Sequence, residues 1–153
     1  MNAAPGISLN TSDGAVLSVS SEQDFHASLE PILREQGWDV VNNHTLASSF
    51  SSLQDRTFSI VICDDNLFPG TWREMLRHVV QMDEPPLLIV TARLADERLW
   101  AEALNLGAHD VLATPFDATE VIRIVGVAQQ RWRNSRALRS GKGKAAMAVG
   151  ATR

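Results

Sequence analysis

Runs of apolar residues recur along the chain and predict five short strands. They cover residues 15–19, 38–41, 58–63, 87–90 and 111–113. Most residues within these runs are apolar, which is typical of strands that are buried on both faces of a parallel sheet. The pattern therefore predicts a sheet with cover on both sides.

The segments between these runs repeat apolar residues at helical spacing. Helices are predicted between Ser21 and Gly37 and over residues 45–53, 71–82, 95–106 and 118–133. In the first helix, Ser21 is the expected N-cap and Gly37 the expected stop, while Pro31 predicts a kink. Strands that alternate with helices of this length predict an α/β fold with a parallel sheet between two layers of helices.

The length of the chain favours one domain with looser ends. Of its 153 residues, 44% are hydrophobic, which is enough for a buried core. We expect residues 1–12 to form a flexible lead, residues 13–132 to form the domain, and residues 133–153 to form a basic tail. This tail is expected to be disordered beyond any helical extension of the last helix.

Charge is divided unevenly along the chain. Residues 131–153 hold seven of the 14 basic residues, including both lysines, and none of the 18 acidic residues. A short basic patch without a recognition fold is weak support for nucleic-acid binding. We therefore expect a solvated linker and no nucleic-acid partner, with nucleic acid or an acidic protein as the minority alternative.

The sequence carries no membrane or export signal that we recognise. No apolar run is long enough to cross a membrane, and the first residues lack the basic and apolar regions of a signal peptide. The single cysteine, Cys63, lies in an apolar run and is expected to be a buried structural thiol. A lone cysteine fits a reducing compartment, so we expect a cytoplasmic protein without a membrane partner.

The third apolar run ends abruptly in two carboxylates, Asp64 and Asp65, followed by NLFPG. Ligands and catalytic groups of open α/β sheets collect at the carboxyl ends of strands. Asp64 is therefore either a nucleophile or metal ligand, or it caps the following loop and helix. Asp65 stands one residue past the strand and is expected to face the other way. The four histidines, His26, His44, His78 and His109, lack metal-ligand spacing and are expected to be solvated or packed.

Several motifs stand around this strand in an order that resembles a known family. They are IVICDD followed by LFPG, LLIVTA in the fourth strand, LNLGAHDVL before the fifth, and TPF after it. With its five strand–helix units, the chain resembles the CheY-like receiver domain of bacterial response regulators over roughly residues 13–132. The resemblance implies a flavodoxin-like, doubly wound five-stranded parallel sheet with strand order 2-1-3-4-5. It also implies a cis proline at Pro115.

In that family a phosphoryl group passes from a histidine kinase to the aspartate at the end of strand three, which is Asp64 here. Such transfer depends mainly on positioning and electrostatic stabilisation. The family therefore supplies two Mg²⁺-binding acids after strand one, a hydroxyl after strand four, a lysine after strand five, and a switch aromatic in strand five. The matching residues here are, in that order, Ser20 and Ser21, Thr91, Thr114, and Val111.

Only Asp64 and Thr91 keep the residue types of the family. Hydroxyls are poor substitutes for the carboxylates that Mg²⁺ prefers, and residues 1–130 contain no lysine. The loss of one electrostatic donor from an active site costs about 2.7–4 kcal/mol in rate terms. The resemblance therefore implies a nucleophile that kept its place while most of its supporting groups changed.

We expect a degenerate receiver domain, or pseudo-receiver, of two-component phosphorelay signalling, which acts through protein–protein contact, is not an enzyme and needs no cofactor. The alternative is a conventional receiver that is phosphorylated on Asp64 by a histidine kinase, with Mg²⁺ held by Asp64 and by Glu22 or Asp65. The partner in either case is a sensor histidine kinase or a downstream effector. The family resemblance places a possible homodimer surface on helix four, strand five and helix five, over residues 95–132.

A third class, a small enzyme or nucleotide binder on the same fold, would carry a glycine-rich phosphate loop after strand one. The sequence SSEQDF stands there instead.

Overall fold

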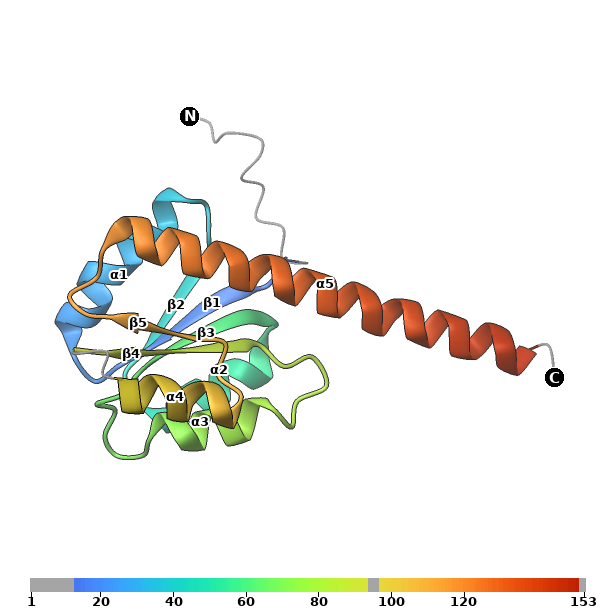
Figure 1. Cartoon of the computed structure of the whole chain (residues 1–153), viewed down its shortest axis with the longest axis horizontal. Coiled ribbons are helices and arrows are strands. Elements are labelled where there is room, and N and C mark those ends of the chain that lie inside the picture. Colours follow the sequence, from blue (N-terminus) through green and yellow to red (C-terminus); the bar gives the residue numbers. More distant parts are fainter. Residues whose placement is uncertain (1–12, 94–96, 152–153) are drawn as a thin grey trace.

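A single five-stranded parallel sheet forms the centre of the molecule, with strand order β2-β1-β3-β4-β5 (Figure 1). The computed structural model describes residues 13–93 and 97–151. The strands are β1 (Ala15–Val19), β2 (Val40–Asn43), β3 (Phe58–Asp64), β4 (Leu87–Ala92) and β5 (Asp110–Ala113). The helices are α1 (Gln23–Glu35), α2 (Leu46–Asp55), α3 (Trp72–Val79), α4 (Glu97–Leu106) and α5 (Ala118–Ala151). The predicted α/β fold and strand order are confirmed.

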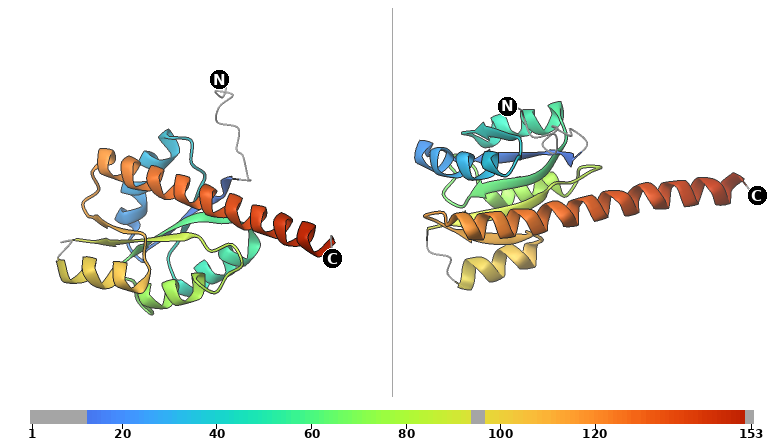
Figure 2. Two further views of the ribbon diagram at one scale, coloured as in Figure 1. Left: turned by 45° about the vertical axis from the view of Figure 1, so that its right-hand side comes forward. Right: turned by 90° about the horizontal axis from the view of Figure 1, so that it is seen from above.

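Helices cover both faces of the sheet (Figure 1 and Figure 2). On the face that we call the α1/α5 face, apolar residues of those two helices pack on Val16, Ile62 and Ile89. On the opposite α2–α4 face, residues of the other three helices pack on Val61 and Cys63. The core is therefore divided into two layers by the sheet, as the largely apolar strands predicted.

The alternation of side chains along each strand decides what the α1/α5 face presents at its carboxyl edge. Residues two apart share a face. Ile62 packs on the α1/α5 face, which places Asp64 on the same face. Val16 in the same way places Ser18 and Ser20 there. The strand pattern thus brings two serines and the candidate nucleophile to one side of the sheet.

One prediction about α1, that of its N-cap, is wrong in detail. The N-cap residue is Glu22 and not Ser21, and it makes no side-chain cap bond. The reason lies in the preceding turn, where the Ser20 hydroxyl accepts a hydrogen bond from the Glu22 N–H at 3.0 Å. Pro31 lies inside α1, and the helix continues through it. Gly37 follows the helix with a φ of +88°, as expected for its stop.

Strand β2 lies two residues later than the apolar run at 38–41 predicted. The backbone of Gly37 and Trp38 is still occupied by hydrogen bonds to the carbonyls of Arg34 and Leu33. Pairing with β1 therefore begins at Val40. The last two residues of the strand are asparagines, and because they are polar the apolar run ends before the strand does.

Helix α5 differs most from its prediction. The expected helix at 118–133 continues to Ala151 and projects beyond the sheet (Figure 1), so the helical extension that the prediction allowed includes residues 133–151. Alanine, arginine and lysine have high helix propensity, which favours the continuation. None of the helices in the described ranges is long and apolar enough to cross a membrane.

Candidate functional site

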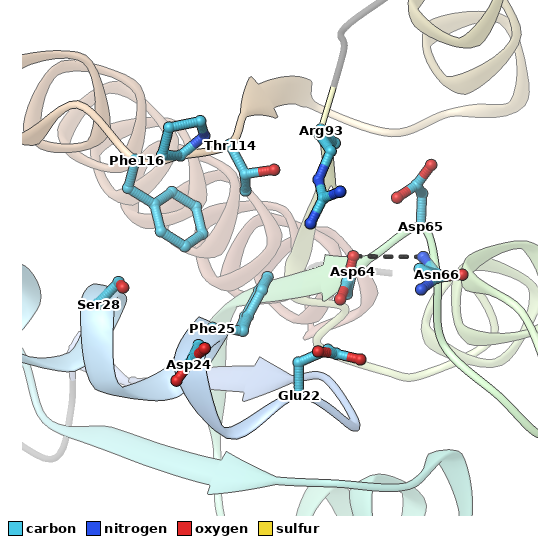
Figure 3. Close-up of a pocket in the computed structure, with 11 residues that line it drawn as sticks. Glu22, Asp24, Phe25, Ser28, Asp64, Asp65, Asn66, Arg93, Thr114 and Phe116 are labelled. Atoms are coloured by element: carbon cyan, nitrogen blue, oxygen red, sulfur yellow. Dashed lines mark hydrogen bonds between the residues drawn. The ribbon is translucent and has the colours of Figure 1, made fainter.

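The carboxyl edge of the sheet carries a cavity of about 610 Å³ above the ends of β1, β3 and β4 (Figure 3). Strand register brings Asp64 directly opposite Thr91. Its lining includes four carboxylates near the ends of β1 and β3, one arginine, one threonine and an aromatic pair. These are Glu22, Asp24, Asp64 and Asp65, Arg93, Thr114, and Phe25 with Phe116. Four of the eight site residues predicted from the sequence line this cavity, namely Glu22, Asp64, Asp65 and Thr114.

Both carboxylate oxygens of Asp64 have hydrogen-bond partners. The Ser20 hydroxyl donates to Oδ2 at 2.7 Å. The backbone N–H of Asn66 donates to Oδ1 at 3.2 Å. Because the Ser20 oxygen also accepts the Glu22 N–H, this one hydroxyl ties the turn after β1 to Asp64. Ser20 is fully buried, whereas Ser21 is exposed, so the two positions that match the acids of the family lie in different environments.

The two threonines of the site differ in their surroundings. Thr91 is fully buried, and its hydroxyl has no hydrogen-bond partner among the described residues. The carbonyl of Thr91 accepts the N–H of Asp65 at 2.9 Å, which joins the ends of β3 and β4. Thr114 lies on the cavity wall at the position of the family lysine. The peptide bond between Thr114 and Pro115 is cis, as the resemblance implied.

Arg93 is the one cation among the described residues that line the cavity. Its side chain reaches from the end of β4 toward Asp64 (Figure 3). Arg93 was not predicted as a site residue, although it stands only two residues after Thr91, because a planar guanidinium does not freely replace the ammonium group of the family lysine. The signal in the sequence was a basic residue directly after the strand that ends near Thr91, at the same edge of the sheet as Asp64.

The acidic residues proposed as alternative metal ligands share the cavity but not one centre. Glu22, Asp64 and Asp65 all line it. The Asp65 carboxylate is directed away from that of Asp64 (Figure 3). Within residues 13–93 and 97–151, no three His, Cys, Asp or Glu side chains gather as a metal-binding group. The three candidate metal ligands therefore line the same cavity, but their carboxylates do not converge on one point.

A buried histidine next to the cavity was not identified as part of the site. His26 of α1 is 1% exposed, and its ring nitrogens lie 3.0 Å from the Ser18 hydroxyl and 2.8 Å from the Ser20 carbonyl oxygen. Burial lowers the pKa of His26, and His44 lowers it further, against the hydrogen bond to Ser20. The sequence signal was the pair of serines at alternate positions of a strand that is otherwise apolar.

Two residues of the resemblance lie on the α2–α4 face. Cys63 is fully buried there, and burial raises the pKa of its thiol far above the ordinary range, as expected for a structural cysteine. Val111, at the switch-aromatic position, belongs to the same layer. Val111 also lines a second hollow of about 350 Å³, beside Trp100 and three acidic residues, Glu97, Asp117 and Glu120.

Comparison with known proteins agrees with this geometry. Residues 16–126 match the response regulator receiver domain family. The chain is 30% identical over 116 residues to the KDP operon transcriptional regulatory protein KdpE of Escherichia coli K12, covering 76% of this chain and 51% of KdpE. The chain thus spans about half the length of that relative.

Solved structures show the same fold. The signal receiver domain of an HD domain-containing protein from Pseudomonas fluorescens Pf-5 superposes with a TM-score of 0.74 at 20% identity, covering 81% of this chain and 92% of that one. The chemotaxis response regulator CheY4 of Vibrio cholerae gives 0.69 at 17% identity, covering 75% and 98%.

The chain belongs to the response regulator receiver domain family of two-component signalling. Members of this family are phosphoacceptors rather than classical enzymes, generally use Mg²⁺ when active, and interact with histidine kinases and effector domains.

Proposed function

We propose that this receiver domain has a degenerate phosphorylation pocket and signals mainly through protein–protein contact. The observation that carries the proposal is the hydrogen bond of 2.7 Å from the Ser20 hydroxyl to Asp64 Oδ2. At this position the family has an acid that helps to hold Mg²⁺. Here a neutral donor satisfies an oxygen of the nucleophile, so Asp64 is hydrogen-bonded without a metal.

The residues around Asp64 do not fit a magnesium ion in this arrangement. Mg²⁺ requires a near-ideal octahedron of oxygen ligands and favours carboxylates. Ser20 is a hydroxyl whose proton points at Asp64, and Ser21 is exposed at the start of the turn. Thr114 supplies no positive charge at the lysine position. A phosphoryl group that arrived at Asp64 would therefore lack two of the charges that stabilise its transfer in the family.

The test is exposure of the full chain to Mg²⁺ and a small phosphodonor, followed by intact-mass measurement. We expect no stable adduct on the wild type. The variant S20D/S21D/T114K restores both acids and the lysine, and it should gain one phosphoryl group that is lost again when Asp64→Ala is added. Asp65→Ala is the matched control and should leave that gain intact. A wild-type adduct that disappears in Asp64→Ala would overturn the proposal.

One observation favours the conventional alternative, in which Asp64 is phosphorylated by a histidine kinase. The buried Thr91 hydroxyl has no partner among the described residues and lies in register with Asp64, where the family hydroxyl contacts phosphate. This alternative requires Glu22 or Asp65 to move toward Asp64 and complete a metal site. It predicts saturable Mg²⁺ binding that is weakened in Glu22→Gln, whereas the degenerate pocket predicts a flat titration.

For contact with partners we propose the surface formed by α4, β5 and α5. Trp100 of α4 is 48% exposed and lines the second hollow together with Val111. Acidic side chains line the same hollow. A sensor kinase, an effector or a second copy of the chain would cover this exposed aromatic group. If a homodimer forms there, sedimentation equilibrium should show Trp100→Ala as more monomeric than the wild type. Val80→Ala, an exposed valine at the end of α3, is the control and should not change the mass.

A further inference from the structure

A buried imidazole, that of His26, forms hydrogen bonds with the end of β1 and with the turn that follows it. His26 is 1% exposed and contacts Ser18 of β1 and Ser20, the first residue of the turn after it. Its Nε2 lies 2.8 Å from the carbonyl oxygen of Ser20, and its Nδ1 lies 3.0 Å from the hydroxyl of Ser18. A buried polar side chain with a partner on each ring nitrogen stabilises one arrangement of the backbone around it.

The chemistry of the two partners assigns the proton on this ring. A carbonyl oxygen only accepts hydrogen bonds, so Nε2 must carry the proton that reaches Ser20. Nδ1 of the neutral ring is then an acceptor, and the Ser18 hydroxyl donates to it. The imidazole therefore acts as a donor to Ser20 and an acceptor from Ser18.

Ser20 is the residue through which this contact reaches the pocket. Its carbonyl faces His26, while its hydroxyl faces Asp64 at 2.7 Å. We propose that His26 is the positioning residue of the Asp64 pocket, because its Nε2–H fixes the Ser20 backbone and thereby keeps the Ser20 hydroxyl on the Asp64 carboxylate. This inference rests on the proposed function, in which the bond from Ser20 to Asp64 defines the degenerate pocket.

A purely structural role for His26 makes a different prediction. The ring also contacts the rings of Phe25 and His44, with centroid distances of 5.4 and 4.8 Å. If these contacts were its whole role, any replacement of similar size would affect the pocket equally. A positioning role instead depends on which end of the side chain carries an N–H.

Two variants separate these roles. In His26→Gln the carboxamide nitrogen reaches the place of Nε2, and in His26→Asn it reaches only the place of Nδ1. Two backbone N–H groups report on the pocket directly. The Glu22 N–H donates to the Ser20 hydroxyl, and the Asn66 N–H donates to Asp64. Amide hydrogen exchange of the full chain, followed by NMR, measures both.

In His26→Asn we expect both amides to exchange about tenfold faster than in the wild type, the effect of losing one hydrogen bond. His26→Gln should restore them to within about threefold of the wild type. Ser20→Ala should match His26→Asn, and the double variant should be no worse than Ser20→Ala alone. The amide of Ile62, in the middle of β3, serves as the internal control for global destabilisation.

The proposal is overturned if His26→Asn leaves both amides unchanged, or if His26→Gln accelerates them as much as His26→Asn does. Should His26→Asn fail to fold, the wild type alone decides: nitrogen NMR of the imidazole should show the Nε2–H tautomer, and the Nδ1–H tautomer would contradict the proposal. No phosphodonor is present in these measurements. A phosphoryl adduct on Asp64 would therefore count against the degenerate pocket while leaving the role of His26 to be judged by the amides.

Discussion

The polar groups at the two edges of the α1/α5 face have opposite surroundings: those at the amino edge are hydrogen-bonded and packed, whereas those at the carboxyl edge line a cavity. At the amino edge, Gln129 of α5 accepts a hydrogen bond from the Ser59 hydroxyl at 2.6 Å and donates to the Asp13 carbonyl at 2.7 Å. Trp132, one turn further on, is 1% exposed and closes that edge. At the carboxyl edge the same sheet carries a cavity of about 610 Å³ lined by four carboxylates.

We infer from this difference that the amino edge of this layer contributes mainly to stability and the carboxyl edge mainly to function. Large side chains of α5 fill the amino edge, and a filled, hydrogen-bonded edge contributes to the free energy of unfolding. Carboxylates gathered around a cavity repel one another and oppose folding. We therefore attribute the carboxylates of the carboxyl edge to chemistry or to partner contacts rather than to stability. Variants at the two edges should therefore affect different measurements.

The largest expected effect is at the amino edge. Trp132→Ala should lower the free energy of unfolding by about 3–5 kcal/mol, because it opens a large cavity in a packed site. Trp132→Phe should cost less, since the indole N–H has no partner among the described residues and its loss removes no hydrogen bond. Urea unfolding measures both variants.

Leu138→Ala is the control for Trp132→Ala, since it lies on the same helix and is 66% exposed. It should change the free energy of unfolding by no more than about 0.5 kcal/mol. A loss in Leu138→Ala that equals the loss in Trp132→Ala would show that α5 is held along its exposed side and not at the amino edge.

The next effect compares one polar group at each edge. Gln129→Leu removes the donor to the Asp13 carbonyl and leaves the Ser59 hydroxyl only its longer contact of 3.5 Å with the Ala15 carbonyl oxygen, and we expect a loss of about 2 kcal/mol. Thr91→Val removes a buried hydroxyl that has no partner among the described residues, so its stability should be unchanged or slightly higher. Thermal and urea unfolding of both variants give the comparison, and a loss in Thr91→Val as large as that in Gln129→Leu would contradict it.

The sequence predicted the elements that depend on local patterns and missed the contacts that depend on the assembled sheet. Apolar runs predicted the strands and helices, and the end of the third run marked Asp64, whereas the strand order and the interest in Thr91 came from the family resemblance. His26 and Gln129 were missed because their partners lie eight and 70 residues away, for Ser18 and Ser59 respectively. A polar residue on a helix is ordinarily a surface residue, and only the packed helix shows that these two are buried.

Titration offers a smaller and more selective comparison of the two edges. The pKa of His26 at the carboxyl edge is lowered by burial, and that of His109 at the amino edge is lowered by burial and by Arg131. Glu30 and His44 are the charged or titratable neighbours of His26, and Asp110 opposes the lowering at His109.

The sign follows from the lowered pKa values. Below the ordinary value of 6.5, the unfolded chain binds more protons than the folded chain, so stability rises with pH. The contribution is complete above pH 6.5 and is lost as the pH falls through the lowered pKa values. We expect the free energy of unfolding to fall as the pH drops from about 7 to about 5. His26→Gln should flatten this dependence more than His109→Gln, because His26 is the more deeply buried of the two.

The smallest expected effect is an ion pair that supports the amino edge from outside. Arg133 donates two hydrogen bonds to the Asp13 carboxylate, at 3.2 and 3.0 Å. The two side chains are 47% and 37% exposed, so water and salt screen their attraction. A double-mutant cycle of Arg133→Ala and Asp13→Ala should give a coupling of about 0.2–1 kcal/mol that shrinks at high salt. A coupling of several kcal/mol that resists salt would show that the amino edge is held by charge, and the contrast with the carboxyl edge would then rest on electrostatics rather than on packing.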